Sequence, residues 1–347
     1  MSEWDRRGRG TPSDESHRAP GSSPSDPYED VRPLLISIAY RMVGSYSEAE
    51  DLVQEAFVRF HQATRRGTEI ESAKAFLTTV TTRLAIDHQR AARVRRETYV
   101  GPWLPDPLVD EMAPDIAQTA ELAESLSTAF LVLLETLSPR ERAVFLLHDV
   151  FDYDYPGIAE VVGTSEANCR QIATRARRRI AIAEPRFETS TRERDRLAER
   201  FLAASRRGDV EALVAMLAND ATFVGDGGAK GNGLAGPVVG RERVGRLVAS
   251  FTRRMGELGI SLQPVHVGAQ PGVLLVDPEG RVGGVWSLHV VDGVVREIHG
   301  VVNPDKLGHL GVVSPLAFRA TREDRTDEDE QREQPEQREG EAHDDDD

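Results

Sequence analysis

The sequence has a single cysteine and no hydrophobic run of membrane-spanning length. Cys169 alone excludes an intramolecular disulfide and cannot by itself build a zinc site. It falls on the apolar side of a predicted helix, so we expect a small buried hydrophobe rather than a redox sensor. The N-terminus also lacks the hydrophobic core of a signal peptide. These absences indicate a cytoplasmic protein that works without a membrane, a metal or a cofactor.

Negative charge is abundant but unevenly placed. The 347 residues have a formal net charge of −15, and residues 321–347 alone carry 14 acidic and 4 basic side chains. We expect this acidic tail (318–347) to be disordered, as we do residues 1–26, which are rich in Ser, Pro and Gly. The tail could mimic nucleic acid and mask a basic face, although a solubilising role is simpler. Arginines are concentrated elsewhere, around 90–96 and 170–179, so these segments can present positive charge to DNA although the net charge of the chain is negative.

Residues 137–180 have the pattern of a helix-turn-helix. Ser138 and Glu141 form a capping box at the start of a helix with an apolar face. A short second helix, 158–162, ends at Gly163, a residue suited to a left-handed C-cap. Two helices joined by a tight turn with glycine place the second of them in the DNA major groove.

The helix that follows, capped by Thr164 or Ser165, separates into two faces. Its apolar stripe must pack inward and consists of Cys169, Ile172, Ala173, Ala176 and Ile180. Its other face carries side chains suited to base edges and phosphates, and the residues expected to bind DNA are Ser165, Arg170, Gln171, Thr174, Arg175 and Arg178. The alternative is a basic, solvated helix in an ordinary bundle.

A second helical block precedes this one. A first amphipathic helix begins near Tyr28, and Ser47 with Glu50 predicts a capping box for the next helix. The outward positions of that second helix are Asp51, Gln54, Glu55 and Val58. A third helix, about 71–98, is apolar at first and ends in four arginines: Arg90, Arg93, Arg95 and Arg96. The helix dipole favours one or two such cations, so four suggest a phosphate-binding end.

Residues 97–117 form a linker with prolines at 102, 105, 107 and 114, which exclude a continuous helix. Trp103 and Leu104 are costly to leave in water, so we expect this linker to dock on something. The simplest surface to receive it is the flank of a neighbouring helical region.

A third region, 192–310, is predicted to combine helices with strands. Two helices, a short strand at 221–226 and a helix at 241–255 come first. Strand-like runs at 260–268, 272–277, 283–291 and 293–302 follow, so we expect an α+β domain with an antiparallel meander. Four titratable groups are candidates for a pocket, although a single His on a strand is usually a wall residue: Asp226, His266, His289 and His299.

Together these segments resemble an extracytoplasmic-function sigma factor of bacterial RNA polymerase. The resemblance rests on EDLVQEAF, AFLTTVTTRLAIDHQR, LSPRERAVFLLHDVF and the helix-turn-helix ending in RARRRI. WLPDP (103–107), DGGAK (226–230) and NPDKL (303–307) resemble the motifs of the group with a fused SnoaL-like domain, in which Ala229 departs from the usual glycine. The implied architecture is all-α region 2 (27–96) and region 4 (118–184), followed by a cone-shaped α+β SnoaL/NTF2-like domain (192–310).

The resemblance also implies partners. The helix-turn-helix would read the −35 promoter element, and region 4 would contact the polymerase flap. The face with Asp51, Gln54 and Glu55 would dock on the clamp helices of the largest polymerase subunit. The −10 element, with a base flipped into a pocket near 65–71, would meet the third helix of region 2. The residues implied for that contact are Arg83, Asp87, Arg90, Arg93 and Arg96.

The fused domain is expected to regulate activity in cis. The implied interdomain residues are Trp103, Leu104, Pro105, Asp226, Gly227, Gly228, Lys230, Asn303, Pro304, Asp305, Lys306 and Leu307. A small molecule could bind the pocket of this domain. The alternative is a helix-turn-helix regulator fused to a ligand-binding or catalytic SnoaL-like domain. Region 2 discriminates between the two, because an ordinary regulator has no need of EDLVQEAF and an arginine-tipped helix.

Overall fold

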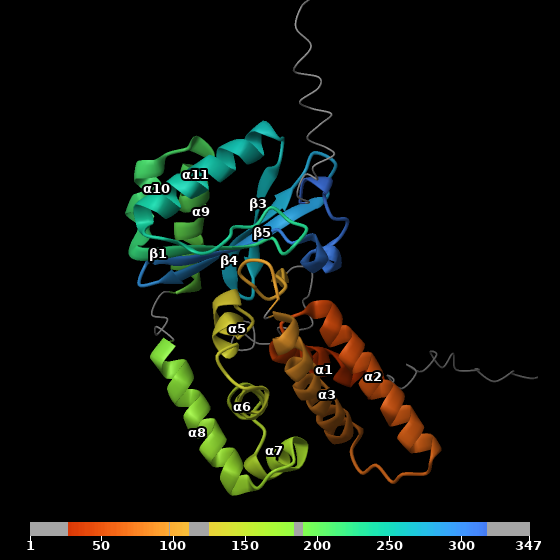
Figure 1. The fold of residues 1–347 in the computed structure, drawn as a ribbon. Helices are drawn as coiled ribbons and strands as arrows, with labels where there is room; N and C mark the ends of the chain where they lie inside the picture. The colour runs from red at the N-terminus through yellow and green to blue at the C-terminus, as the bar shows by residue number, and fades with distance from the viewer. Residues whose placement is uncertain (1–26, 97, 111–124, 184–189, 318–347) are drawn as a thin grey trace, which may run out of the picture.

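The computed structural model describes residues 27–96, 98–110, 125–183 and 190–317. The expectations about 1–26, 111–117 and the acidic tail lie outside these residues, as do the side chains of Arg93, Arg95 and Arg96. A helical body precedes a mixed α/β domain, and the segment 98–110 runs between them (Figure 1). This is the fold class that the sequence predicts.

Region 2 consists of three helices packed on one another. They are α1 (Pro27–Val43), α2 (Tyr46–Arg65) and α3 (Ala73–Arg96). The capping box expected from Ser47 and Glu50 is wrong. Helix α2 starts at Tyr46 after Ser45, whose side chain makes no capping hydrogen bond. The backbone N–H of Tyr46 instead donates to the Asp106 carboxylate at 2.9 Å, so the linker supplies the acceptor. Helix α3 begins two residues later than expected, where the Ser72 hydroxyl accepts from the Ala75 N–H.

Region 4 continues the same body. Its elements are α5 (Thr128–Leu134), α6 (Pro139–Phe145), the π-helical turn η2 (Leu146–Val150), α7 (Tyr155–Val162) and α8 (Glu166–Ala183). The capping box of Ser138 with Glu141 is confirmed, and so is the left-handed Gly163 at φ 69°. Every residue of the predicted apolar stripe on α8 is buried, Cys169 included. One continuous hydrophobic core joins these helices to those of region 2.

The C-terminal domain covers one face of a sheet with helices. The helices are α9 (Thr191–Arg207), α10 (Val210–Met216) and α11 (Arg241–Glu257). The strands are β1 (Leu217–Asp226), β2 (Val238–Val239), β3 (Ser261–Val267), β4 (Gln270–Val276), β5 (Val282–Val291) and β6 (Val294–Val301), in the order β2-β1-β6-β5-β4-β3. The meander β3 to β6 is antiparallel as predicted, and β1 joins it in parallel to β6.

Strands β4 and β5 are buried at every position, which means that both faces of the sheet are covered. On one face Phe223, Phe251 and Trp286 pack among α9, α10 and α11. The other face receives Leu104 and Val109 of the linker, together with residues that follow β6. Those residues include the short 3-10 helices η3 (Pro304–Lys306), η4 (Gly308–Leu310) and η5 (Pro315–Ala317). The linker is therefore part of the core of this domain.

Candidate nucleic-acid interface and interdomain site

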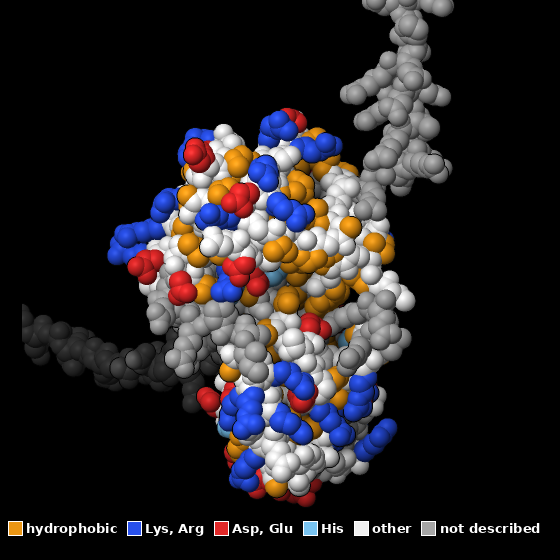
Figure 2. All heavy atoms as spheres, turned by 60° about the vertical axis from the view of Figure 1, so that its left-hand side comes forward, with side chains coloured by type: hydrophobic (Ala, Val, Ile, Leu, Met, Phe, Trp, Pro, Cys, Tyr) orange, Lys and Arg blue, Asp and Glu red, His pale blue; other side chains and the backbone are white. Residues whose placement is uncertain are grey.

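Helix α8 presents a shallow hollow of about 380 Å³ lined by Arg170, Gln171, Thr174 and Arg175. All four side chains are exposed, and the arginines on this side of the helical body stand out in Figure 2. Ser165 lies at the start of the helix, where its hydroxyl accepts from the Asn168 N–H at 3.3 Å. The Ser165 side chain is thus engaged in capping, and the other residues form the outward face.

The arginines of α8 divide into two kinds. Arg177 pairs with Asp149 at 2.6 Å and Arg179 pairs with Glu141 at 2.9 Å, so both tie α8 to the rest of region 4. Arg175 and Arg178 are exposed. Arg170 lies over the Tyr155 ring, 5.1 Å from its centroid, and pairs with Glu166. A ring and a carboxylate orient this guanidinium at the edge of the hollow.

The residues predicted for the −10 element have different surroundings. The Arg83 guanidinium donates to the backbone oxygens of Glu160 (2.7 Å) and Val161 (2.9 Å), at the end of α7. Arg83 therefore ties region 2 to the helix-turn-helix in this arrangement, a contact with no sequence signal. Arg90 pairs with Asp87 at 2.9 Å, and both are exposed. For Arg93 and Arg96 the backbone alone is described.

The outward face of α2 is exposed as predicted. Asp51, Gln54 and Glu55 all face solvent, and Glu55 pairs with Arg59 at 2.8 Å. Val58 on the same face is 43% exposed, which leaves an apolar side chain beside the acidic ones. Acidic groups around an exposed valine suit a docking surface for a basic partner.

The DGGAK motif (226–230), the NPDKL motif (303–307) and the linker meet around Asp226, at the end of β1. The Asp226 carboxylate is fully buried and accepts from the Tyr99 hydroxyl (2.5 Å), the Leu104 N–H (2.8 Å) and the Gly228 N–H (3.1 Å). Lys306 lies 2.8 Å from the same carboxylate and also donates to the Leu104 backbone oxygen. A buried ion pair whose members both grip the Leu104 backbone fixes the linker in place.

Aromatic side chains surround this ion pair. The Lys306 ammonium lies 4.3 Å from the centroid of the Trp103 ring and 5.1 Å from that of Tyr99. The Asn303 amide donates to the Tyr99 hydroxyl at 2.8 Å. Burial and the hydrogen bond to Asp226 raise the pKa of Tyr99, so this hydroxyl remains a donor at neutral pH. Cation–π contacts and a saturated carboxylate compensate for taking both charges out of water.

The glycines of DGGAK are required by close packing. A Cβ on Gly227 would lie 2.0 Å from the backbone nitrogen of Gly233, and Gly228 has φ 57° beside the Asn303 amide. Ala229, which departs from the family motif, is exposed and outside the left-handed region. The remaining motif residues surround this site. Pro105, Pro304 and Leu307 are buried, and Lys230 pairs with Asp305 at 2.7 Å on the surface.

Sequence reasoning missed Asp106, although it lies within WLPDP. The buried carboxylate of Asp106 caps α2 by accepting from the Tyr46 N–H. The backbone oxygen of Asp106 accepts from the Tyr40 hydroxyl at 2.6 Å. Burial raises the pKa of Asp106, while Lys306 and the hydrogen bonds from Ser45 and Tyr46 lower it. The linker thus holds the C-terminal domain at Leu104 and region 2 at Asp106.

A second missed contact lies at the tip of the β3–β4 hairpin. The N–H groups of Gly268 and Ala269 donate to the two carboxylate oxygens of Asp110, at 2.8 and 2.9 Å. A Cβ on Gly268 would lie 2.2 Å from the Leu126 backbone oxygen, so only glycine fits where the hairpin meets region 4. The linker is therefore gripped from Tyr99 to Asp110.

The four candidate pocket groups have different partners and do not all share one site. Asp226 serves the linker, and His266 pairs with Asp195 at 43% exposure. His299 lies 3.3 Å from Glu297 on β6, and burial lowers the pKa of His289 to about 4. Phe223, Phe251 and Trp286 occupy the space between sheet and helices. Within the described residues, no helix combines the length and apolar character needed to cross a bilayer.

The fold and these sites agree with the comparisons with known families. Residues 27–95 match the model for Sigma-70 region 2, residues 127–180 that for Sigma-70 region 4, and residues 198–300 that for the SnoaL-like domain. The chain therefore has the two DNA-handling regions of the sigma-70 class with a SnoaL-like domain after them.

Relatives narrow the class. The chain is 36% identical over 289 residues to the ECF RNA polymerase sigma factor SigJ of Mycobacterium tuberculosis, covering 80% of this chain and 91% of SigJ. It is 33% identical over 281 residues to a probable ECF sigma factor, SigI, of the same species, covering 80% and 93%. The crystal structure of SigJ superposes with a TM-score of 0.65 at 33% identity, over 83% of this chain and 98% of the other. The chain belongs to the extracytoplasmic-function sigma factors of RNA polymerase, which confirms the resemblance read from the sequence.

Proposed function

We propose that this sigma factor brings core RNA polymerase to promoters with a −35 and a −10 element, and that its C-terminal domain controls that activity in cis. One observation carries the cis control: Asp226 and Lys306, one from each C-terminal motif, both hold the backbone of Leu104 in the linker between regions 2 and 4. The linker sets the separation of the two regions. A domain that grips the linker therefore biases that separation.

For polymerase, the outer face of α2 is the docking surface. Asp51, Gln54 and Glu55 are exposed, and Val58 adds apolar area. Asp51→Lys combined with Glu55→Lys should weaken binding to core polymerase at least tenfold by charge reversal. The matched control is Glu199→Lys with Glu211→Lys, which makes the same charge change on the C-terminal domain. Equal affinity of the first variant and the parent would refute this docking face.

For DNA, the work is divided between the two regions. Arg170, Gln171 and Arg175 read the −35 element as duplex, with the flap of polymerase behind region 4, and Arg83 to Arg96 serve the −10 element. Gln171→Ala should change which −35 sequences are preferred, whereas Arg96→Gln should weaken all promoters evenly and reduce the salt slope. Binding assays over a panel of −35 variants separate the two effects. A uniform loss for both would contradict the division.

For cis control, three changes test the proposal at once. They are truncation after Leu307, removal of the chain from Arg192 onward, and Trp103→Ala, which strips the ring from Lys306. Each should give a transcriptional activity different from that of the full chain in a reconstituted assay at equal protein level. The exposed Val100→Ala is the control within the linker. If all three matched the full chain on one promoter, the C-terminal domain would be a passenger.

A further inference from the structure

The exposed side of α11 carries a stripe of arginines, the α11 stripe, made of Arg243, Arg246, Arg253 and Arg254. At 100° per residue these four positions fall within about a third of the helix circumference. The acidic side chains beside them are Glu242, which pairs with Arg241, and Glu257, whose pair with Arg253 is long at 4.0 Å and exposed. Positive charge along the stripe therefore exceeds what its neighbours neutralise.

The helix dipole does not explain this arrangement. Cations are favoured within the last turn of a helix, where Arg254 lies. Arg243 lies in the first turn, where the dipole disfavours positive charge. Among the described residues, no hydrogen bond or ion pair involves the side chain of Arg243 or Arg254. Such a face suits an anionic partner.

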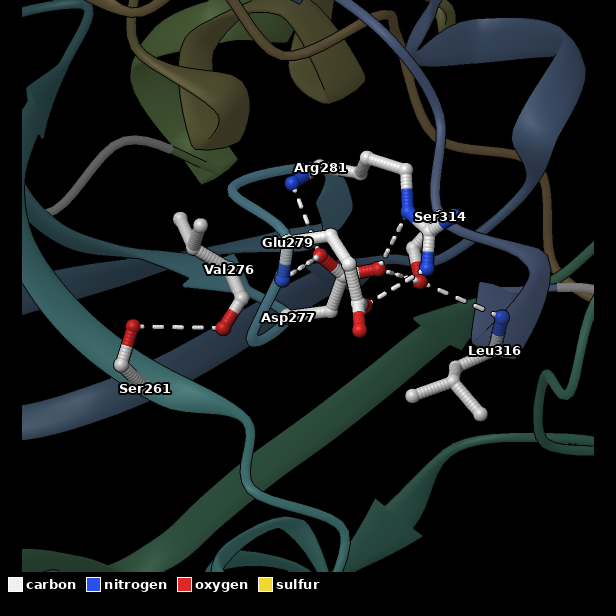
Figure 3. Close-up of polar contacts among 7 residues, drawn as sticks. All are labelled: Ser261, Val276, Asp277, Glu279, Arg281, Ser314 and Leu316. Atoms are coloured by element: carbon white, nitrogen blue, oxygen red, sulfur yellow. Dashed lines mark hydrogen bonds and ion pairs between the residues drawn. The ribbon is translucent and has the colours of Figure 1, made fainter.

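The last described residues pack on the face of the sheet opposite α11, next to the turn between β4 and β5. Residues 312–314 pair with the start of β5 through the Val282 N–H and backbone oxygen, both at 2.8 Å. The Ser314 hydroxyl donates to the Asp277 carboxylate at 2.7 Å, and Arg281 lies 2.8 Å from the same carboxylate (Figure 3). Asp277 is followed by Pro278, which packs against Gly259, two residues beyond the end of α11. The segment that leaves the structure at Ala317 is thus anchored near the C-terminal end of the α11 stripe.

We propose that the acidic tail, residues 318–347, lies along the α11 stripe of its own chain. The tail holds 14 acidic side chains against four basic ones in residues 321–347, so the charges are complementary. A flexible chain of this length has a root-mean-square span of roughly 30 Å. Arg243 and Arg254 are separated by roughly 17 Å of helix at 1.5 Å per residue. The tail therefore reaches the whole stripe without being stretched.

Tethering favours the tail over a free polyanion. A segment attached this close has an effective concentration on the order of millimolar, so weak ion pairs suffice to hold it. The arginines on α8 are the competing basic face, but they belong to region 4 and not to the domain in which the tail is anchored. The consequence is that the tail covers a basic surface that would otherwise bind nucleic acid without sequence preference.

Energy transfer within the full chain tests the proposal. One dye is attached at Ala342→Cys and the other at Gly256→Cys, an exposed position on α11 with open space around it, with Cys169→Ala in all variants. We expect transfer to fall roughly twofold in 1 M NaCl, where the Debye length is about 3 Å. It should fall equally when the four arginines are changed to Gln, or when Asp344 to Asp347 are changed to Asn.

The matched control keeps the dyes at positions 342 and 256 and changes Arg170, Arg175 and Arg178 on α8 to Gln. This change should leave the transfer to position 256 as it was. Transfer to 256 that ignores both salt and the stripe substitutions overturns the proposal. So does transfer that responds only to the α8 substitutions, which would place the tail on the DNA-reading helix. If transfer is unchanged and binding of unrelated duplex DNA to the full chain is lost with the stripe, the stripe is a DNA surface and the proposal is wrong.

Discussion

The junction between regions 2 and 4 is mainly apolar, whereas the junction between the linker and the C-terminal domain is polar. Regions 2 and 4 share a continuous apolar core, in which Arg41 and Arg142 are the largest fully buried side chains. The linker and the C-terminal domain meet instead around buried charge, with Asp226 and Lys306 at the centre. Both junctions position the linker, but they differ in what a single substitution does.

The difference concerns specificity. Apolar surfaces attract one another in many relative orientations, whereas a buried carboxylate must find its donors in one geometry. The polar junction therefore fixes where Leu104 lies, and the apolar junction stabilises whatever packing results. The apolar junction is not free of buried charge, since Arg41 and Arg142 lie within it. Both expectations can be broken by single substitutions, one in each junction.

The largest effect is expected at the apolar junction, from Arg142→Met. Arg142 on α6 donates to the Met42 oxygen of α1 at 2.7 Å and to the Leu134 oxygen at 3.0 Å, and it pairs with Glu135. Without the guanidinium these buried acceptors lose their hydrogen-bond donor, which should lower the free energy of unfolding by about 3 kcal/mol. The midpoint of thermal unfolding measures the loss. Arg140→Met, an exposed arginine of the same helix, is the control. If both variants unfold together with the parent, the buried arginine is not what stabilises this junction.

At the polar junction, Asp226→Asn keeps the shape but removes the counterion of buried Lys306. We expect the attachment of the linker to weaken by about 2 kcal/mol, and hydrogen exchange of the Leu104 amide to quicken more than tenfold. Asp220→Asn on the same strand removes only an exposed pair with Arg296, so it should change little. Unchanged protection of Leu104 in Asp226→Asn would show that apolar packing alone seats the linker.

A smaller effect is expected for Asp106→Asn, because an amide oxygen still accepts from the Tyr46 N–H. Burial raises the pKa of the Asp106 carboxyl, so the folded chain favours its protonated form. The contribution of that form is complete below the ordinary value of 3.8 and is lost as pH rises through the raised pKa. The thermal midpoint of the parent should therefore exceed that of Asp106→Asn most at low pH, by a difference that shrinks as pH rises. A difference that grows with pH would mean that the ionised carboxylate is the favoured form.

The two junctions also differ in how far the sequence predicts them. Periodicity identified the apolar stripe of α8 and the outward face of α2, because helical spacing reports which side is buried. It could not say which surfaces bury one another, so the contact of Arg83 with α7 was not foreseen. Family motifs brought Trp103, Asp226 and Lys306 together where composition had only suggested that the linker docks.

Other misses have a single physical cause. The capping box at Ser47 failed because Asp106, distant in sequence, supplies the acceptor. The four candidate pocket groups were grouped wrongly because strand order does not reveal which side chains fill the space between sheet and helices. The sequence did not indicate that position 268 must be glycine, because the atom that a Cβ would meet there belongs to Leu126 in another region. Local patterns predict elements, and long-range contacts decide how these elements meet.

The smallest effect is expected from Arg83, which belongs to the apolar junction here and to the −10 element in the proposed function. Its Nε–H and one Nη–H already donate to the α7 carbonyls, so we expect the two uses of the guanidinium to compete. In the free protein, Arg83→Gln should cost only about 0.5 kcal/mol, because the contact is exposed. In the polymerase complex it should weaken all promoters evenly and reduce the salt slope by about 1.

Arg83→Lys separates these two uses. The ammonium retains the charge for phosphate but lacks the fork that spans two carbonyls. We therefore expect it to keep the parent's salt slope while losing the stability contribution, and Arg90→Gln, away from α7, to show the reverse. A salt slope for Arg83→Gln equal to that of the parent would restrict Arg83 to the junction, and the −10 contact would then fall to the arginines further along α3.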